Sequence, residues 1–306
     1  MSINFKGKVA IVTGAGGGLG RQHALAFAKR GAKVVVNDLG GSRDGVGGSV
    51  SAAQAVVDEI KAAGGEAIAN GASVTDYAAV QAMVQQAVDT WGRVDILINN
   101  AGILRDKSFA KMEIADFELV MNVHLMGAVH CCKAVWPHMI TQKYGRIVMT
   151  TSSSGLYGNF GQSNYGAAKM ALVGLMQTLS IEGAKNDIRV NCLAPTAATR
   201  MTEDLMSEAV LQALKPEAVV PAMLVLASAD APNRTILCAG AGTFEAANIT
   251  LTQGVYLGLD SDTPERLAER LSEVTAREGE IVPQSGAAQG GNEIQKAMAG
   301  ASLIAA

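Results

Sequence analysis

Short apolar runs alternate along the first 200 residues with longer stretches in which apolar residues recur at helical spacing. Short runs rich in β-branched residues predict buried strands, and recurrence at i, i+3 and i+4 predicts amphipathic helices. Strands are therefore expected at 9–13, 34–37, 67–69, 96–99, 146–151 and 189–193. Helices are expected at 21–30, 51–63, 77–91 and 116–143, with a further helix beginning near residue 165.

The regular alternation of strand and helix indicates the fold class. Strands that are apolar throughout and separated by helices are typical of a parallel sheet covered on both faces. With right-handed crossovers, such a chain forms a doubly wound sheet, the Rossmann fold. We therefore predict an α/β protein with one Rossmann domain at 1–258, in which 236–257 supplies one or two further strands.

Two segments depart from this pattern. Residues 40–48 form a glycine-rich loop after the second strand, which is either a mobile flap or a solvated insertion. From residue 239 onward the periodicity fades, and 284–306 is rich in glycine and alanine. Residues 259–306 are predicted to be a C-terminal extension that is helical, weakly ordered or part of a contact between subunits.

Composition narrows the function classes. The chain has 306 residues, of which 49% are hydrophobic and 17% charged, so it can bury a substantial core. A net charge of −3 gives no basic surface for nucleic acid or anionic membranes. Lys6 and Lys8 interrupt any early apolar run, and no apolar stretch is expected to reach the ~20 residues of a membrane helix. We expect neither a nucleic-acid nor a membrane partner.

The four cysteines have neither the spacing of a zinc site nor that of a disulfide framework. Cys131 and Cys132 lie in an apolar helical run and are expected to be buried structural thiols. No metal site is predicted, and the reducing cytoplasm is the expected location.

A glycine-rich segment, Thr-Gly-Ala-Gly-Gly-Gly-Leu-Gly, runs from Thr13 to Gly20 between the first strand and the first helix. Glycines in this context let the backbone approach a pyrophosphate, while the helix start supplies N–H donors. The segment lacks the Gly-Lys-Ser/Thr ending of a phosphate-binding Walker loop. It predicts a dinucleotide site that includes Gly14, Gly18, Leu19 and Gly20.

Asp38 stands at the end of the second strand. A carboxylate there can accept hydrogen bonds from the adenosine ribose and repel a 2′-phosphate, and no Arg or Lys adjoins it. Asp38 therefore favours NAD over NADP. The Asn-Asn-Ala-Gly segment that contains Asn100, Ala101 and Gly102 ends the fourth strand, so it should border the same cofactor.

Tyr165 and Lys169 are four residues apart near a helix start and share one helix face, and Ser152 follows the fifth strand. Interconversion of an alcohol and a ketone needs a proton acceptor or donor at the oxygen. A nearby ammonium favours a phenolate, so Lys169 is expected to lower the pKa of Tyr165. Ser152 can hold the substrate oxygen against Tyr165.

Together these motifs resemble the short-chain dehydrogenase/reductase family over about residues 5–230. The resemblance implies that Ser152 polarises the substrate, that Tyr165 is the acid/base, and that Lys169 binds the nicotinamide ribose. The full set of residues expected around the cofactor is Gly14, Gly18, Leu19, Gly20, Asp38, Ser73, Val74, Asn100, Ala101, Gly102, Tyr165, Lys169 and Pro195.

The chain departs from the family pattern at two positions. His124 replaces a family asparagine in the long helix, where it is either a helix histidine with its own partners or the holder of a relay water. Thr196 replaces the glycine that usually follows the proline after the sixth strand. Residues 200–202 are expected to belong to a flexible substrate lid.

Longer segments, among them NDLGGSRDGVGGS and GLYGNFGQSNYGAAK, resemble the (3R)-hydroxyacyl-CoA dehydrogenase part of peroxisomal multifunctional enzyme type 2 and its bacterial single-domain relatives. This resemblance implies NAD-dependent oxidation of a 3-hydroxyacyl-CoA. The alternatives are a hydroxysteroid (17β-type) or other bulky-alcohol dehydrogenase and, in another class, a non-catalytic nucleotide-sensing protein. The family also implies a homodimer or homotetramer that pairs through the long helices.

Overall fold

The computed structural model describes residues 3–41, 44–45, 47, 49–197 and 208–304. The chain forms two compact units, Met1–Ala246 (the Rossmann unit) and Ala247–Ala306 (the C-terminal unit). The Rossmann unit thus ends at Ala246, whereas the sequence pattern placed the boundary at 258. The expected substrate lid at 200–202 lies outside the described residues.

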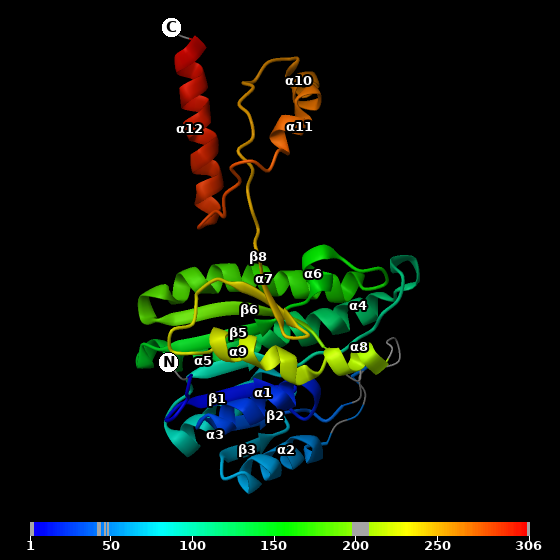
Figure 1. Cartoon of the computed structure of the whole chain (residues 1–306), viewed down its shortest axis with the longest axis vertical. Coiled ribbons are helices and arrows are strands. Elements are labelled where there is room, and N and C mark those ends of the chain that lie inside the picture. The colour runs from blue at the N-terminus through cyan, green and yellow to red at the C-terminus, as the bar shows by residue number, and fades with distance from the viewer. Residues whose placement is uncertain (1–2, 42–43, 46, 48, 198–207, 305–306) are drawn as a thin grey trace. The chain divides into compact units, whose positions relative to one another are not determined.

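The Rossmann unit contains a single eight-stranded sheet in the order β3-β2-β1-β4-β5-β6-β7-β8 (Figure 1). All hydrogen-bonded pairs from β3 to β7 are parallel, which confirms the predicted doubly wound α/β fold. The strands are β1 (Val9–Thr13), β2 (Lys33–Asn37), β3 (Glu66–Asn70), β4 (Ile96–Asn99), β5 (Gly145–Thr150), β6 (Ile188–Thr196), β7 (Ile236–Gly240) and β8 (Thr243–Ala247).

The helices that pack on the sheet form two sets. In one set α1 contacts α2 and α9, and in the other α3 contacts α5 while α4 contacts α7. The core between helices and strands is largely aliphatic, as the apolar strands predict, and includes the edge-to-face pair Phe5 and Phe27. The helices of this unit are α1 (Gly18–Lys29), α2 (Ser51–Ala62), α3 (Tyr77–Trp91), α4 (Ile114–Met121), α5 (Gly127–Gln142), α6 (Ser153–Tyr157), α7 (Ser163–Gly183), α8 (Glu208–Ala213) and α9 (Val220–Leu226).

The long helix expected at 116–143 is interrupted. A π-helical turn, Asn122–Met126, separates α4 from α5, and His124 lies within it. Single π-helical turns inside α-helices occur frequently at functional sites. In the described part of the chain, Ile114–Gln142 is also the one helix with the length and apolar composition of a membrane span. It packs against β4, β5 and α7, as a core helix does.

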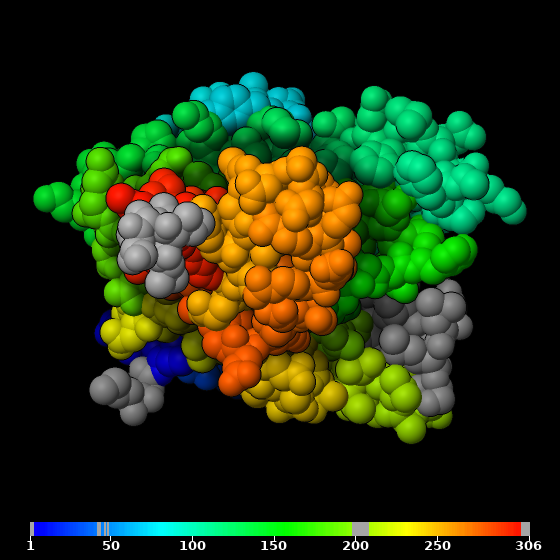
Figure 2. Space-filling view, turned by 90° about the horizontal axis from the view of Figure 1, so that it is seen from above, coloured from blue at the N-terminus to red at the C-terminus, as the bar shows by residue number. Residues whose placement is uncertain are grey.

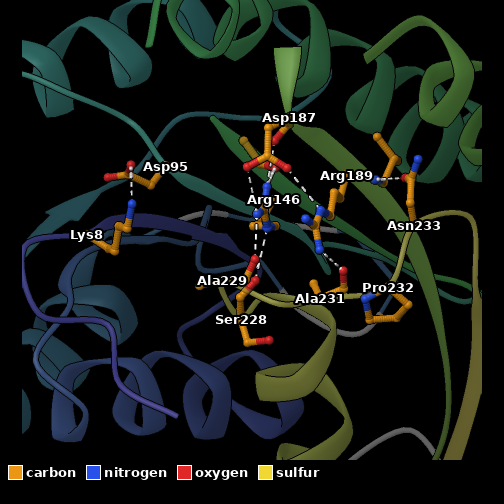
Figure 3. Close-up of polar contacts among 12 residues, drawn as sticks. Lys8, Asp95, Arg146, Asp187, Arg189, Ser228, Ala229, Ala231, Pro232 and Asn233 are labelled. Atoms are coloured by element: carbon orange, nitrogen blue, oxygen red, sulfur yellow. Dashed lines mark hydrogen bonds and ion pairs between the residues drawn. The ribbon is translucent and has the colours of Figure 1, made fainter. Parts of the chain in front are cut away.

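The amino ends of the central strands are fastened by a buried polar cluster (Figure 3). Arg146, at the start of β5, is 1% exposed, and its guanidinium donates to the backbone carbonyls of Ser228, Ala229 and Asp187. It also pairs with the Asp187 carboxylate at 3.1 Å. The motif residues all follow the carboxyl ends of the strands. The cluster therefore stabilises the sheet at the end opposite the candidate site.

The C-terminal unit is helical rather than weakly ordered. It contains α10 (Thr263–Glu269), α11 (Leu271–Val274) and α12 (Gly286–Ile304), coloured orange to red in Figure 2. An extended segment is held within this unit by a bridge between Leu251 and Ile281, and the Tyr256 ring lies against Gly300 of α12. Gly300 of α12 thus leaves room for the Tyr256 side chain of its own unit.

Candidate active site

A cleft of about 660 Å³ opens at the carboxyl ends of the central strands. Every residue that the sequence motifs assigned to the cofactor or to catalysis lines this cleft, except Gly20. Gly20 instead packs beneath the glycine-rich turn, where an added Cβ would lie 2.2 Å from the Gly14 carbonyl oxygen. The fold therefore brings together residues as far apart in the chain as Gly14 and Pro195.

The turns after β1 and β4 are locked to each other. The Asn100 side-chain amide donates to the carbonyl oxygens of Thr13 (3.0 Å) and Gly14 (3.1 Å). The Thr13 hydroxyl oxygen accepts from the backbone N–H groups of Asn100 and Ala101. Gly14 has φ +62°, and an added Cβ would lie 2.8 Å from the Ala101 Cα. Only a residue without a side chain fits this turn, which leaves a bare backbone surface facing the cleft.

Asp38 is fixed at the end of β2. One carboxylate oxygen accepts from the Gly16 N–H and the other from the Gly40 N–H, both at 2.7 Å. An added Cβ at Gly16 would lie 2.9 Å from that carboxylate, so glycine allows the close approach. The carboxylate is thereby oriented before any ligand binds.

The glycine-rich loop after β2 is part of the cleft rather than only a solvated insertion. Gly41 and Gly45 line the cleft. The Arg105 guanidinium, from the segment after β4, donates to the Asp44 carbonyl oxygen at 2.8 Å. This bond connects the described part of the loop with the segment that follows the Asn-Asn-Ala-Gly turn.

Ser152, Tyr165 and Lys169 meet at the other end of the cleft. Ser152 caps α6, and its hydroxyl oxygen accepts from the Ser154 N–H at 3.2 Å. Lys169 is 3% exposed, and its ammonium donates to the Thr150 carbonyl oxygen at 2.6 Å and lies 5.4 Å from the centre of the Tyr165 ring. Burial lowers the pKa of Lys169 to about 7.

The pKa of Tyr165 differs from the sequence expectation. Lys169 was expected to lower it, but burial raises the pKa of Tyr165 above its ordinary value of 10, against a smaller opposing effect of Ser152. The physical reason is that burial of the Tyr165 ring disfavours the charged phenolate, and the nearby Asp106 carboxylate raises the pKa of Tyr165 further. Tyr165 is therefore held as a neutral phenol.

His124 is buried beside these groups. Its Nε2 lies 3.1 Å from the Ile103 nitrogen and 2.8 Å from the Ile103 carbonyl oxygen, while Nδ1 has no partner among the described residues. The ring packs edge-on against Tyr165. Burial, with help from Lys169, lowers the pKa of His124 to about 3. A cavity of about 10 Å³ beside His124 and Lys169 has roughly the volume that one water needs.

Several cleft residues were not predicted from the sequence. Leu104 and Leu119 supply apolar walls, and Asn159 and Gln162 supply polar ones. The position of Leu104 just after a strand end could have indicated it, because ligands bind at the carboxyl ends of parallel strands. Asn159 and Gln162 lie in an irregular loop, where no periodic pattern gives a signal.

The model of the short chain dehydrogenase family matches residues 8–209, which contain every one of the motifs above. The chain belongs to the short-chain dehydrogenase family.

Two solved structures share its fold. Full-length peroxisomal multifunctional enzyme type 2 from Drosophila melanogaster is 37% identical, with a TM-score of 0.79 over 96% of this chain and 50% of that chain. A 7α-hydroxysteroid dehydrogenase complexed with NADH and a 7-oxo bile acid is 31% identical, with a TM-score of 0.70 over 78% of this chain and 95% of that chain.

Curated relatives agree with this assignment. Peroxisomal multifunctional enzyme A from Dictyostelium discoideum is 50% identical over 286 residues, which is 93% of this chain but 64% of that protein. A 3-oxoacyl-[acyl-carrier-protein] reductase from Synechocystis is 44% identical over 206 residues, 67% of this chain and 80% of that protein. The chain spans less than two thirds of the length of the multifunctional relatives. It is an oxidoreductase of the short-chain dehydrogenase type.

Proposed function

We propose that this protein oxidises a (3R)-3-hydroxyacyl-CoA to a 3-oxoacyl-CoA with NAD as the hydride acceptor. The observation that carries the proposal is one cleft with Asp38 at one end and Ser152, Tyr165 and Lys169 at the other. Its similarity to multifunctional enzymes and to a 3-oxoacyl reductase supports a 3-hydroxyacyl or 3-oxoacyl substrate.

The cleft suits a dinucleotide. The backbone at Gly14, where a side chain would collide with the Ala101 backbone, would face the pyrophosphate, and the start of α1 would supply N–H donors. The Asp38 carboxylate would accept hydrogen bonds from the adenosine ribose and repel a 2′-phosphate, which favours NAD. NAD, when bound, accepts the hydride from the alcohol carbon.

The protein's own groups handle the alcohol oxygen. Because the Ser152 oxygen already accepts from the Ser154 N–H, its proton can be donated to the substrate oxygen. As the phenolate, Tyr165 takes the hydroxyl proton during oxidation, and as the neutral phenol it donates a proton to the substrate oxygen during reduction. Since burial raises the pKa of Tyr165, the neutral phenol suits reduction, and the rate of oxidation should rise with pH. Lys169 is placed to bind the ribose hydroxyls.

The substrate end of the cleft is lined by apolar side chains that suit an acyl chain. Ile103, Leu104, Leu119 and Val123 line the cleft together with the catalytic groups. The same walls would accept a flat sterol, and the fold similarity to a hydroxysteroid dehydrogenase makes such an alcohol the second candidate.

A substrate panel tests the proposal. The purified protein is assayed for NADH or NADPH formation with (3R)- and (3S)-3-hydroxyacyl-CoA of several chain lengths and with a bile-acid alcohol. We expect the highest kcat/KM for a (3R) thioester with NAD. A higher kcat/KM for the steroid, or no turnover of any (3R) thioester, contradicts the proposed substrate.

A further inference from the structure

Ser152 and Tyr165 come from different elements but must reach the same substrate oxygen. Ser152 caps α6, and Tyr165 lies in the first turn of α7. Misplacement of such groups by about 1 Å can cost on the order of 100-fold in rate. The contacts between the start of α6 and the start of α7 therefore bear directly on turnover.

On one side, small residues bring the two helices into direct contact. An added Cβ at Gly155 would lie 2.7 Å from the Lys169 Cβ, and one at Gly166 would lie 3.1 Å from the Ser154 carbonyl oxygen. The Thr151 hydroxyl donates to the Lys169 carbonyl oxygen at 2.7 Å. These contacts set how closely the helices approach, but they do not hold the Ser154 side chain.

On the other side, the Gln162 side chain joins three segments. Its Oε1 accepts from the Ser154 hydroxyl at 2.8 Å and from the Asn159 amide at 3.1 Å. Its Nε2 donates to the Asp106 carboxylate at 2.7 Å. Gln162 is the residue that precedes α7, and Ser154 is the residue whose N–H binds the Ser152 oxygen.

Asp106 gives this amide a single orientation. An amide side chain can turn over and exchange its donor and acceptor ends, but an ionised carboxylate only accepts. Nε2 must therefore face Asp106, and Oε1 must face Ser154. The segment that carries Asp106 is itself bonded to the start of α7, because the Lys107 N–H donates to the Gly161 carbonyl and the Asn164 amide donates to the Arg105 carbonyl.

We propose that Asp106 and Gln162 form a positioning pair that fixes the Ser152 turn relative to Tyr165. The pair sets the distance between the two groups that hold the substrate oxygen, and it does not take part in proton transfer. This inference rests on the proposed dehydrogenase function only in that both groups act on one alcohol oxygen. Nothing in it depends on which alcohol that is.

An exchange of donor and acceptor tests the pair. Gln162→Glu places two carboxylates face to face, so we expect kcat to fall by between about 10- and 100-fold. In the double variant Asp106→Asn/Gln162→Glu, the new amide can donate to the new carboxylate, which still accepts from Ser154. We expect kcat within about threefold of wild type, since the hydrogen bond is restored with its direction reversed. Asp106→Asn alone can still accept from Gln162, so the maximum kcat should change little. It removes a charge that raises the pKa of Tyr165, so kcat is compared at each variant's pH optimum from full pH profiles.

The control is Gln85→Glu, because Gln85 donates to Asp89 at 2.7 Å in an exposed pair on α3. This variant makes the same charge change away from the cleft and should leave kcat unchanged. NAD affinity and Tm should be unchanged in all variants. If the double variant has a kcat as low as that of Gln162→Glu, the proposed positioning role is refuted. A Gln162→Glu variant with wild-type kcat also refutes it. Loss of NAD binding together with a lower Tm would show a merely structural role and also overturn it.

The two proposals fail separately. Wild-type turnover of the (3R) thioester tests the proposed substrate. The positioning pair is tested by ratios of variant to wild-type kcat, taken with whichever alcohol of the panel is oxidised fastest. A steroid-preferring enzyme that shows the rescue would refute the first proposal and support the second.

Discussion

His23 should make the protein sensitive to mild acid. Its side chain is fully buried in α1, and neither ring nitrogen has a hydrogen-bond partner among the described residues. Burial lowers the pKa of His23 to about 3, whereas the unfolded chain returns it to the ordinary 6.5. Between these values the unfolded state binds more protons than the folded state. Stability is therefore complete above pH 6.5 and falls as the pH drops through this window.

The size of the effect follows from the two pKa values. Each pKa unit corresponds to about 1.4 kcal/mol, and pH 5 lies about 1.5 units below the unfolded pKa. Protonation of His23 in the unfolded state thus removes about 2 kcal/mol of folding free energy at pH 5. His124, whose pKa is also lowered to about 3, contributes a similar loss. Together they remove about 4 kcal/mol, a large share of the roughly 5–15 kcal/mol that is typical of a folded protein.

Urea unfolding at pH 7.5 and pH 5 measures this effect in the wild type and in His23→Leu. The substitution removes two unpaired polar atoms and keeps an apolar side chain, so we expect stability within about 1 kcal/mol of wild type at pH 7.5. At pH 5 the variant should gain about 2 kcal/mol relative to wild type. The same stability difference at both pH values would refute the assignment of His23 as an uncharged, unpartnered core residue.

Three further substitutions test the stability of the sheet and the contacts within the cleft. Arg146→Ala removes the side-chain donor of the Ser228, Ala229 and Asp187 carbonyls and leaves the space of a fully buried side chain, while the Asp187 carboxylate keeps its pair with Arg189. Urea unfolding should therefore show a loss of about 3–5 kcal/mol while kcat at low temperature is retained. In Asp38→Ala the affinity for NAD, measured by calorimetry, should fall about tenfold or more, because a hydrogen bond to a charged group contributes about 1.5–3 kcal/mol. The ratio of the affinity for NAD to the affinity for NADP should fall as well. Gly102→Ala places a Cβ 2.3 Å from the His124 ring and should cost about 1–3 kcal/mol in unfolding experiments, with partial recovery in a His124→Ala background.

The order of strands in the sequence, and the set of residues that meet in the cleft, could be predicted. Both follow from short apolar runs and from the positions of residues just after strand ends. β1 was expected at 9–13 and found there, since a run of β-branched and small apolar residues between a charged turn and a glycine cluster suits only a buried strand. Ser152 and Gly14 could be placed together because both follow carboxyl ends of parallel strands, although they lie far apart in the chain.

Features that depend on tertiary contacts could not be predicted. The π-helical turn around His124 has the same apolar pattern as the α-helices on either side of it. The spacing of apolar residues therefore does not distinguish this turn from an α-helix. The glycines of α12 weaken the helical signal in its sequence, and the contact of Gly300 with Tyr256 depends on the tertiary fold of this unit. The pKa of Tyr165 depends on how deeply Tyr165 is buried, a property that its spacing from Lys169 in sequence does not contain.

The central claim is that this cleft oxidises a (3R)-3-hydroxyacyl-CoA with NAD through Tyr165. The most direct measurement is NADH formation from that thioester by the wild type and by Tyr165→Phe, with NAD affinity measured on both. We expect turnover by the wild type, turnover at least about a thousandfold lower by the variant, and equal NAD affinity for both. A variant within tenfold of wild type, or a wild type that binds NAD but forms no NADH, would contradict it.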